Sequence, residues 1–216
     1  LVVPNQTRRP DRECGLTFCY IGTANFPAEM LTPLVEGWRR AHATDALLER
    51  SRLVFRGHFG AGLARGATRH VAMIISGATD GVSYEGPVAK RDLANVYANC
   101  DALVLILAGG RYVTAGKTYE YVASGLPIMS VHAERHGATE ILGDYPLWVP
   151  PPVPLDADNV AESFVATARL VIETTDNRRT LAADYGRSYE RRAMLRPAVR
   201  ALAEAVAGKT ASVGRT

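Results

Sequence analysis

Short apolar runs that end near a glycine alternate along this chain with segments of helical periodicity. The clearest runs are Leu16–Ile21 ahead of Gly22, Leu53–Phe55 ahead of Gly57, and Ala102–Leu107. Runs of this length, separated by helices, are typical of parallel strands that are buried on both faces of a sheet. The pattern therefore predicts an α/β fold: a Rossmann-like parallel sheet with helices on both faces, followed by C-terminal helices.

The same pattern predicts the order of the elements. Strands are expected over 16–21, 53–55, 82–84, 102–107 and 128–131, with a short one from 148, and helices over 29–42, 90–99, 117–124 and 139–142. Residues 70–75 are too few to separate helix from strand by period, but the alternation favours a helix. The first helix should bury its apolar stripe, which consists of Leu31, Leu34, Val35 and Trp38.

Prolines divide the chain near residue 150. The segment 148–154 should leave the sheet in an extended form, because proline cannot donate a hydrogen bond to a strand ladder. We therefore divide the chain into a linker remnant at 1–15, a Rossmann-like domain at 16–154, whose ligand is argued below, and C-terminal helices at 155–216 that pack on the same domain. Asp156 or Asp158 should cap the first of these helices. Its core positions are Val160, Phe164, Ala168 and Val171, and the last helix carries Leu195, Val199, Leu202 and Val206.

Composition narrows the class of partner. With 216 residues, of which 47% are hydrophobic, the chain can bury the core of one α/β domain. Its 25 basic and 22 acidic residues leave a charge of +3, which is too small to indicate a nucleic-acid partner. Basic residues late in the chain alternate with acidic ones, which favours a solvated helix face; peripheral contact with an anionic membrane is the alternative.

Cysteine usage and hydropathy predict the compartment. Three cysteines, at positions 14, 19 and 100, form neither a metal-binding spacing nor a disulfide framework. Cys19 falls in an expected strand and should lie in the core. No apolar run approaches the ~20 residues of a membrane span, so a cytoplasmic protein is expected.

Residues 116–130 combine a cation, a carboxylate and a helix stop. Lys117 and Glu120 stand three apart and therefore project from one side of a helix, and Gly125 with Pro127 ends that helix before an apolar strand. A solvated ion pair is the simple alternative. The position after a strand indicates a nucleotide instead, because ligands bind beyond the carboxyl ends of parallel strands, where helix N-termini attract anions.

Glycines support the same location. Gly22, Gly57, Gly86 and the pair Gly109–Gly110 each follow an expected strand. One glycine would mean only a turn, but glycines after four neighbouring strands let the backbone approach a ligand closely. They indicate a nucleotide cleft at this edge of the sheet.

Several segments resemble the GT-B glycosyltransferases of the group 1 family. Residues 117–127 follow that family's pattern Lys-x-x-Glu-Tyr-x-Ala-x-Gly-x-Pro. The similarity covers about residues 1–142 in the family's order, through 20–23, 53–57, 82–88 and 91–104. Leu1–Asn5 resembles the stretch where the family's chain crosses from the acceptor domain to the donor domain. The resemblance implies that this chain is the C-terminal, nucleotide-sugar-binding half, and that the N-terminal acceptor domain is missing.

The resemblance and the sheet geometry together assign roles to the residues of the cleft. Gly116 and the first amides of its helix, including that of Thr118, should face the diphosphate, and Lys117 adds a cation there. Glu120 falls on the family's ribose-binding carboxylate, which can accept both ribose hydroxyls at once.

The remaining roles concern backbone rather than side chains. Gly86 and Val88 should frame the base through backbone contacts. Gly22 should lie under the diphosphate.

Two departures from the family pattern affect the sugar and the phosphates. Many members carry a second glutamate eight residues before the ribose one, where it binds the sugar; this chain has Tyr112, so Tyr112 or Arg111 is expected to replace it. Residues 23–28 lack the Arg and Lys that many members place after the first glycine. The charge of the phosphates is therefore expected to be balanced by Lys117, Arg111 and the helix dipole. The loop 133–137, which approaches the donor sugar in the family, is either a contact or a polar connection.

The implied activity is that of a hexosyltransferase-like enzyme of glycan biosynthesis. It would move a sugar from a nucleotide diphosphate-sugar to an acceptor, with no metal and no other cofactor, by positioning the donor and stabilising the departing diphosphate. The isolated chain, without its acceptor half, is expected to be inactive. Two alternatives remain open: a nucleotide-sugar epimerase of the same fold, and a non-catalytic Rossmann-like nucleotide-binding module.

Overall fold

A computed structural model describes residues 15–23, 27–58, 72–75, 80–109 and 116–189, with a few positions between 195 and 204. Its six strands form one sheet in the order β3-β2-β1-β4-β5-β6, and every neighbouring pair is parallel. The strands are β1 Thr17–Ile21, β2 Arg52–Arg56, β3 Val82–Tyr84, β4 Ala102–Ile106, β5 Ile128–Val131 and β6 Trp148–Val149. The strand order reverses between β1 and β4, which is where a sheet of this order opens a crevice for ligands.

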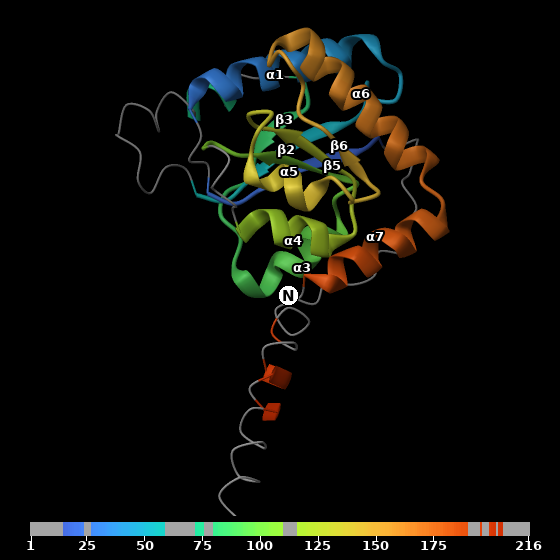
Figure 1. Ribbon diagram of the computed structural model, residues 1–216. Helices are drawn as coiled ribbons and strands as arrows, with labels where there is room; N and C mark the ends of the chain where they lie inside the picture. The colour runs from blue at the N-terminus through green and yellow to red at the C-terminus, as the bar shows by residue number, and fades with distance from the viewer. Residues whose placement is uncertain are drawn as a thin grey trace, which may run out of the picture.

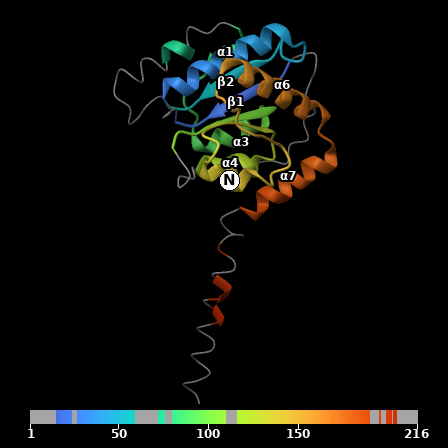
Figure 2. The same cartoon turned by 45° about the horizontal axis from the view of Figure 1, so that its top comes forward.

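Helices cover both faces of the sheet (Figure 1 and Figure 2). On one face lie α1 Ala28–Thr44 and α6 Ala157–Glu173, which pack against each other. The other face carries the short turn η1 Lys90–Asp92 with α3 Leu93–Ala98, then α4 Gly116–Ser124, α5 Gly137–Leu142 and α7 Asp176–Ser188. Residues 72–75 are also helical, as the alternation predicted. The predicted α/β class is therefore confirmed.

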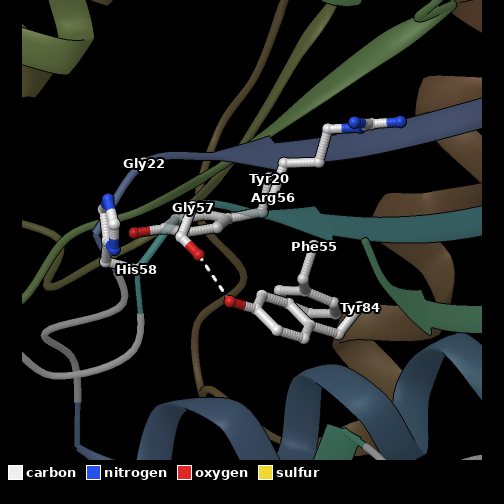
Figure 3. Close-up of a pocket in the computed structure, with 7 residues that line it drawn as sticks. All are labelled: Tyr20, Gly22, Phe55, Arg56, Gly57, His58 and Tyr84. Atoms are coloured by element: carbon white, nitrogen blue, oxygen red, sulfur yellow. Dashed lines mark hydrogen bonds between the residues drawn. The ribbon is translucent and has the colours of Figure 1, made fainter. Parts of the chain in front are cut away.

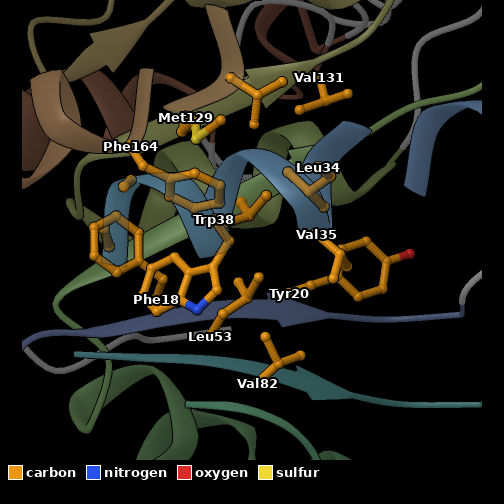
Figure 4. Packing of buried hydrophobic residues seen from close by; sticks show 14 of the residues in the cluster. Phe18, Tyr20, Leu34, Val35, Trp38, Leu53, Val82, Met129, Val131 and Phe164 are labelled. Atoms are coloured by element: carbon orange, nitrogen blue, oxygen red, sulfur yellow. The ribbon is translucent and has the colours of Figure 1, made fainter. Parts of the chain in front are cut away.

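Aromatic rings dominate the core on the α1 and α6 face (Figure 4). Phe18 of β1 lies 5.4 Å from Trp38 of α1 and 5.5 Å from Phe164 of α6, between ring centroids, and Trp38 and Phe164 lie 5.0 Å apart. All three meet edge to face, the arrangement that aromatic quadrupoles favour. The stripe predicted for the first helix is buried in full, and so are the four predicted core positions of α6.

The opposite face is built on tyrosines. Tyr97 of α3 and Tyr121 of α4 are fully buried, with ring centroids 6.2 Å apart. Cys19 is buried on this face, as expected, and both it and Cys100 are free thiols. Each buried tyrosine brings a hydroxyl that needs a partner, so this side of the sheet is more polar than the other.

The helix cap predicted at the start of the C-terminal helices is present. Asp156 caps α6 by accepting a hydrogen bond from the Asn159 amide at 2.9 Å. Helix α7 was not delimited from the sequence; it packs on α4 so closely that a Cβ on Gly186 would lie 2.6 Å from the Val122 carbonyl oxygen. Leu195 and Val199 are exposed, and positions 202 and 206 lie outside the described residues.

The predicted linker remnant at 1–15 lies outside the described residues except for Gly15. The division at 154 and 155 stays a prediction. Within the described part of the chain, no helix is both long and apolar enough to cross a membrane.

Candidate functional site

Three glycines meet at the carboxyl ends of β1, β2 and β3. The Gly22 amide donates to the Arg56 carbonyl at 2.8 Å, and the Gly57 amide donates to the Gly86 carbonyl at 2.9 Å. At Gly57, where φ is +130°, a Cβ would stand 1.9 Å from the Gly22 carbonyl oxygen. The backbone therefore requires glycine at position 57, because any side chain would collide with the end of β1.

The glycine alignment predicted from the sequence is thus present after these three strands. Gly109 follows β4 and adopts a φ of +114°. Gly110 lies outside the described residues.

Helix α4 is tied to the last residue of β1 by one side chain. The Ile21 amide donates to the Tyr121 hydroxyl at 2.8 Å, and both groups are buried. Tyr121 lies one helical turn after Lys117, on the same side of α4. This bond holds the first turn of α4 over the β1 end of the crevice.

Lys117 crosses the end of β1 to reach the other face of the sheet. Its ammonium nitrogen lies 2.6 Å from the Tyr20 hydroxyl and 3.9 Å from the centre of the Tyr20 ring. A Cβ on Gly22 would lie 2.4 Å from Lys117 Cε and Nζ. The missing side chain of Gly22 is therefore what lets the lysine pass.

Burial lowers the pKa of Lys117 from 10.5 to about 8, against the opposing charge of Glu120, which raises it. Its hydroxyl partner is uncharged, because burial raises the pKa of Tyr20 well above its usual range. No ion pair to Lys117 is found among the described residues. A cation so placed, with an aromatic ring and a neutral phenol as neighbours, is suited to receive an anionic ligand.

Glu120 is exposed on α4, and within the described part of the chain no ion pair links it to Lys117. The simple alternative of a solvated Lys117–Glu120 pair is therefore not what the side chains do here. Gly116 is exposed, with open space where a Cβ would be. The first amides of α4 have no partner within the helix, as at every helix start.

The other predicted residues fall into three groups. Gly86, with a φ of +75° and open space beside it, and Val88, which is half-buried, lie in the segment after β3. Thr118 is fully buried, and its hydroxyl finds no hydrogen-bond partner among the described residues. Arg111 and Tyr112 lie outside the described residues, so their roles stay predictions.

A shallow hollow opens beside the glycines at the ends of β1, β2 and β3 (Figure 3). Tyr84 closes one side by donating its hydroxyl to the Gly57 carbonyl at 2.7 Å. Its empty space of about 150 Å³ includes open solvent, so the hollow is a surface depression and not an enclosed ligand pocket. Tyr20 and Gly22, the neighbours of Lys117, are among the residues that line it.

Two buried histidines lie at the carboxyl end of β5. His132 follows that strand directly, and His136 caps α5 by accepting a hydrogen bond from the Ala138 amide at 3.0 Å. The sequence drew attention to the loop 133–137 but not to His132, because a histidine after an apolar run gives no pattern of its own. No group of three or more metal-ligating side chains occurs in the described part of the chain.

Solved structures with similar folds decide the fold family. The catalytic domain of cholesterol-α-glucosyltransferase from Helicobacter pylori matches with a TM-score of 0.54 at 13% identity, over 81% of this chain and 96% of that one. HepE from Anabaena, in complex with UDP-glucose, matches with a TM-score of 0.59 at 15% identity, over 90% of this chain and 49% of that one. The chain has a GT-B glycosyltransferase fold.

Two further solved structures have similar folds but are more than twice as long as the part that this chain matches. WaaG, a glycosyltransferase involved in lipopolysaccharide biosynthesis, matches with a TM-score of 0.52 at 16% identity, over 82% of this chain and 43% of that one. A protein assigned as a UDP-N-acetylglucosamine 2-epimerase from Listeria monocytogenes matches with a TM-score of 0.50 at 14% identity, over 79% and 43%. This chain thus spans less than half the length of HepE, WaaG and the epimerase. No protein-family model and no curated protein matches it in sequence.

Proposed function

We propose that this chain is the donor-binding half of a glycosyltransferase and that it binds a nucleotide diphosphate-sugar at the crevice between β1 and β4. One observation carries the proposal: Lys117 is held at the start of α4, over Gly22, with a neutral phenol as its hydrogen-bond partner. A fixed cation beside a helix N-terminus, at the point where the strand order reverses, is an arrangement that binds phosphates. The UDP-glucose in HepE makes a sugar donor the natural ligand to test.

The diphosphate would lie against the first amides of α4 and the Lys117 ammonium. The helix dipole and the free amides favour a negative charge there. Lys117 contributes a charge-assisted hydrogen bond, which is stronger than a neutral one. A bound phosphate would supply the counter-charge that offsets the desolvation of the lysine.

The nucleoside would extend from this point along the outer side of α4. Glu120 is exposed, is not ion-paired within the described residues, and can accept two hydroxyl groups at once. Gly86 leaves open space beside the backbone of the segment after β3, which suits close approach of a base. Ribose contact at Glu120 and base contact at Gly86 and Val88 complete the proposed site.

Transfer itself would require a second, acceptor-binding domain. The groups assigned above would hold the donor and stabilise the departing diphosphate, and none of them is assigned to an acceptor. We therefore expect the isolated chain to bind nucleoside diphosphate and to transfer nothing. Detectable transfer to a defined acceptor by these residues alone would contradict that expectation.

Calorimetry with UDP, GDP, ADP and dTDP tests binding and identifies the base. Glu120→Gln keeps the size of the side chain and removes its charge, so the affinity for the preferred nucleotide should fall by about 1–3 kcal/mol. The melting temperature should barely change, because an exposed carboxylate contributes little to stability. The 2′,3′-dideoxy form of that nucleotide is the control and should bind both proteins equally.

The alternatives give different results in the same experiments. An epimerase would interconvert a free nucleotide sugar with no acceptor present. A non-catalytic module would bind nucleotide but gain no activity when an acceptor domain is supplied. Failure of all four nucleotides to bind would overturn the proposed function.

A further inference from the structure

Tyr20 carries a polar group from the apolar core to the crevice. Only 1% of the residue is exposed, and its ring packs on Phe55 with 5.9 Å between the ring centroids. Figure 4 shows the Tyr20 hydroxyl at the margin of the cluster, pointing away from the other side chains. Because closely packed rings have little room to move, this hydroxyl has a defined position beside the end of β1.

Two hydrogen bonds set the direction of the hydroxyl. It donates to the Thr23 carbonyl at 2.7 Å, and the Lys117 ammonium donates to it at 2.6 Å. A hydroxyl has one proton to give, and here the proton goes to Thr23, so a lone pair of the oxygen faces Lys117. The phenol is also neutral, because burial raises the pKa of Tyr20. It therefore orients the ammonium without cancelling its charge.

The ammonium keeps hydrogen-bonding capacity for a ligand. It has three N–H groups, and within the described residues the Tyr20 hydroxyl is the one acceptor that it meets. Lys117 and Gly22 are half-buried and Thr23 is exposed. The surface depression that Tyr20 and Gly22 line is open to solvent. A phosphate can therefore approach the remaining N–H groups from the crevice.

A shortage of other cations makes the orientation of Lys117 important. Residues 23–28 contain no arginine and no lysine, although many enzymes of this fold carry both there. A lysine side chain loses much rotamer freedom when a ligand orders it. A lysine that is already held in place loses less of that freedom on binding, so more of the attraction to phosphate appears as affinity.

We propose that Tyr20 is a positioning residue for the donor's diphosphate: its hydroxyl holds the Lys117 ammonium over Gly22, so that one ordered cation compensates for the basic residues missing from 23–28. The inference rests on the proposed function, because it takes the ligand of Lys117 to be a diphosphate. Tyr20 acts through Lys117 and touches no group of the ligand.

Two other roles for the hydroxyl are less consistent with these contacts. It could serve only to tie α4 to β1, but the buried bond between Tyr121 and the Ile21 amide already makes that connection. It could also bind the phosphate itself, but its proton is donated to the Thr23 carbonyl. Each role gives a different result in the experiments that follow.

Tyr20→Phe removes the hydroxyl and keeps the ring, over whose centre the ammonium lies at 3.9 Å. The affinity for UDP, or for the diphosphate of whichever base binds, should fall roughly three- to tenfold, as expected when one long side chain must be ordered on binding. The affinity for uridine should not change. Calorimetry measures UDP binding, and an NMR titration measures uridine binding.

Tyr145→Phe is the matched control for this substitution. It also removes a buried hydroxyl that donates to a backbone carbonyl, that of Leu126, at 2.7 Å. Since this hydroxyl has no contact with Lys117, the UDP affinity of Tyr145→Phe should equal that of the wild type.

A double-mutant cycle tests whether Tyr20 acts through the lysine. Residues that act on a ligand through one contact have non-additive effects. In the Lys117→Met background, Tyr20→Phe should therefore cause no further loss of UDP affinity.

Nitrogen-15 NMR of the ammonium groups gives a check on the wild-type protein itself. A hydrogen-bonded, half-buried ammonium exchanges its protons with water more slowly than a solvated one. At pH 6 the Lys117 ammonium should exchange more slowly than that of Lys90, which is exposed. This difference should disappear in Tyr20→Phe.

Four results would overturn the inference. Wild-type UDP affinity in Tyr20→Phe, or equal exchange at Lys117 and Lys90 in the wild type, would mean that the hydroxyl does not hold the lysine for the ligand. Equal losses for UDP and uridine would make the bond a structural tie. An additional loss in the Lys117→Met background would mean that the hydroxyl contacts the ligand directly. In all four cases the proposed function stands, whereas failure of the wild type to bind any of the nucleotides would overturn both.

Discussion

The two faces of the sheet are built from different aromatic residues. Phe18, Trp38 and Phe164 pack ring against ring on the α1 and α6 face, and the hydroxyl of Tyr20, at the end of that face, is directed to the crevice. On the other face, tyrosine hydroxyls bond to the backbone: Tyr121 to Ile21, and Tyr145 to the Leu126 carbonyl at 2.7 Å. The α1 and α6 face mainly buries apolar area, whereas on the other face buried hydroxyls also hold backbone segments in place.

From this difference we expect the two faces to contribute unequally to stability and to nucleotide binding. Hydrophobic burial is non-directional, so the rings on the α1 face stabilise the sheet mainly by the apolar area that they bury; Trp38 also donates its indole N–H to the Asp80 carbonyl at 2.7 Å. A buried hydroxyl bonded to the last amide of a strand holds a helix in a particular place, because leaving either group unpaired is costly. Helix α4, which carries Lys117 and Glu120, lies on the face that is held in this way. The two faces should therefore respond differently to substitution.

Trp38→Ala should give the largest loss of stability. It removes a fully buried indole from the centre of the aromatic cluster, and such truncations destabilise proteins by about 3–5 kcal/mol. Urea denaturation measures the change. Calorimetry on the folded fraction should find the UDP affinity of the wild type, since the ring touches nothing at the crevice. Loss of UDP affinity by the folded variant would break the separation between the two faces.

Tyr121→Phe should give a smaller loss of stability and a loss of binding. The buried Ile21 amide would lose its hydroxyl partner, at a cost of about 1–3 kcal/mol, and the first turn of α4 would lose its tie to β1. We expect weaker UDP binding in addition to easier unfolding by urea.

Tyr145→Phe is the matched control for Tyr121→Phe. It also removes one buried hydroxyl from the same face, but its partner, the Leu126 carbonyl, follows the far end of α4. Stability should fall by a similar amount while UDP affinity stays at the wild-type value. Equal losses of affinity in both variants would mean that the whole face, rather than the tie at Ile21, positions the site.

The order of the elements was predictable because it depends on short-range pattern. Each expected strand is present to within a residue or two, since an apolar run bounded by glycine has few other structures available to it. The glycine alignment was also predictable, because the carboxyl ends of parallel strands share one edge. Helix α7 was not delimited, because its sequence is largely polar and its contact with α4 depends on Gly186, which has no side chain to give a pattern.

For the candidate site, the sequence predicted which helix carries the residues but not which partners their side chains contact. The motif placed Lys117 and Glu120 on one helix, and the structure agrees. It could not show that Lys117 turns to Tyr20, 97 residues earlier, or that Tyr121 meets Ile21, 100 residues earlier. Helical periodicity tells which side of a helix is buried, but the partner on the other side depends on how the sheet is assembled. The pairing of His132 with His136 depends on the loop geometry in the same way.

Lys117→Met tests a charged group that joins the two faces, and its effect on stability depends on pH. Methionine keeps the apolar stem over Gly22; at pH 7 it removes the cost of desolvating the charged amine but loses the hydrogen bond to Tyr20, so the two contributions oppose each other. The sign depends on pH. Because burial lowers the pKa of Lys117 to about 8, the unfolded chain binds a proton between about pH 8 and 10.5 that the folded protein does not. The stability of the wild type therefore increases as the pH rises through that range.

The melting temperature of Lys117→Met relative to wild type should be highest at pH 7 and should fall toward pH 10. Lys117→Arg stays charged over this pH range, so its melting temperature should decrease relative to that of the wild type as the pH rises. UDP affinity of the wild type should decline above pH 8 as the amine loses its charge, whereas uridine affinity should not. If the melting-temperature difference between Lys117→Met and the wild type did not change with pH, Lys117 would be well solvated in the folded protein, and Tyr20 would not hold it between the two faces of the sheet.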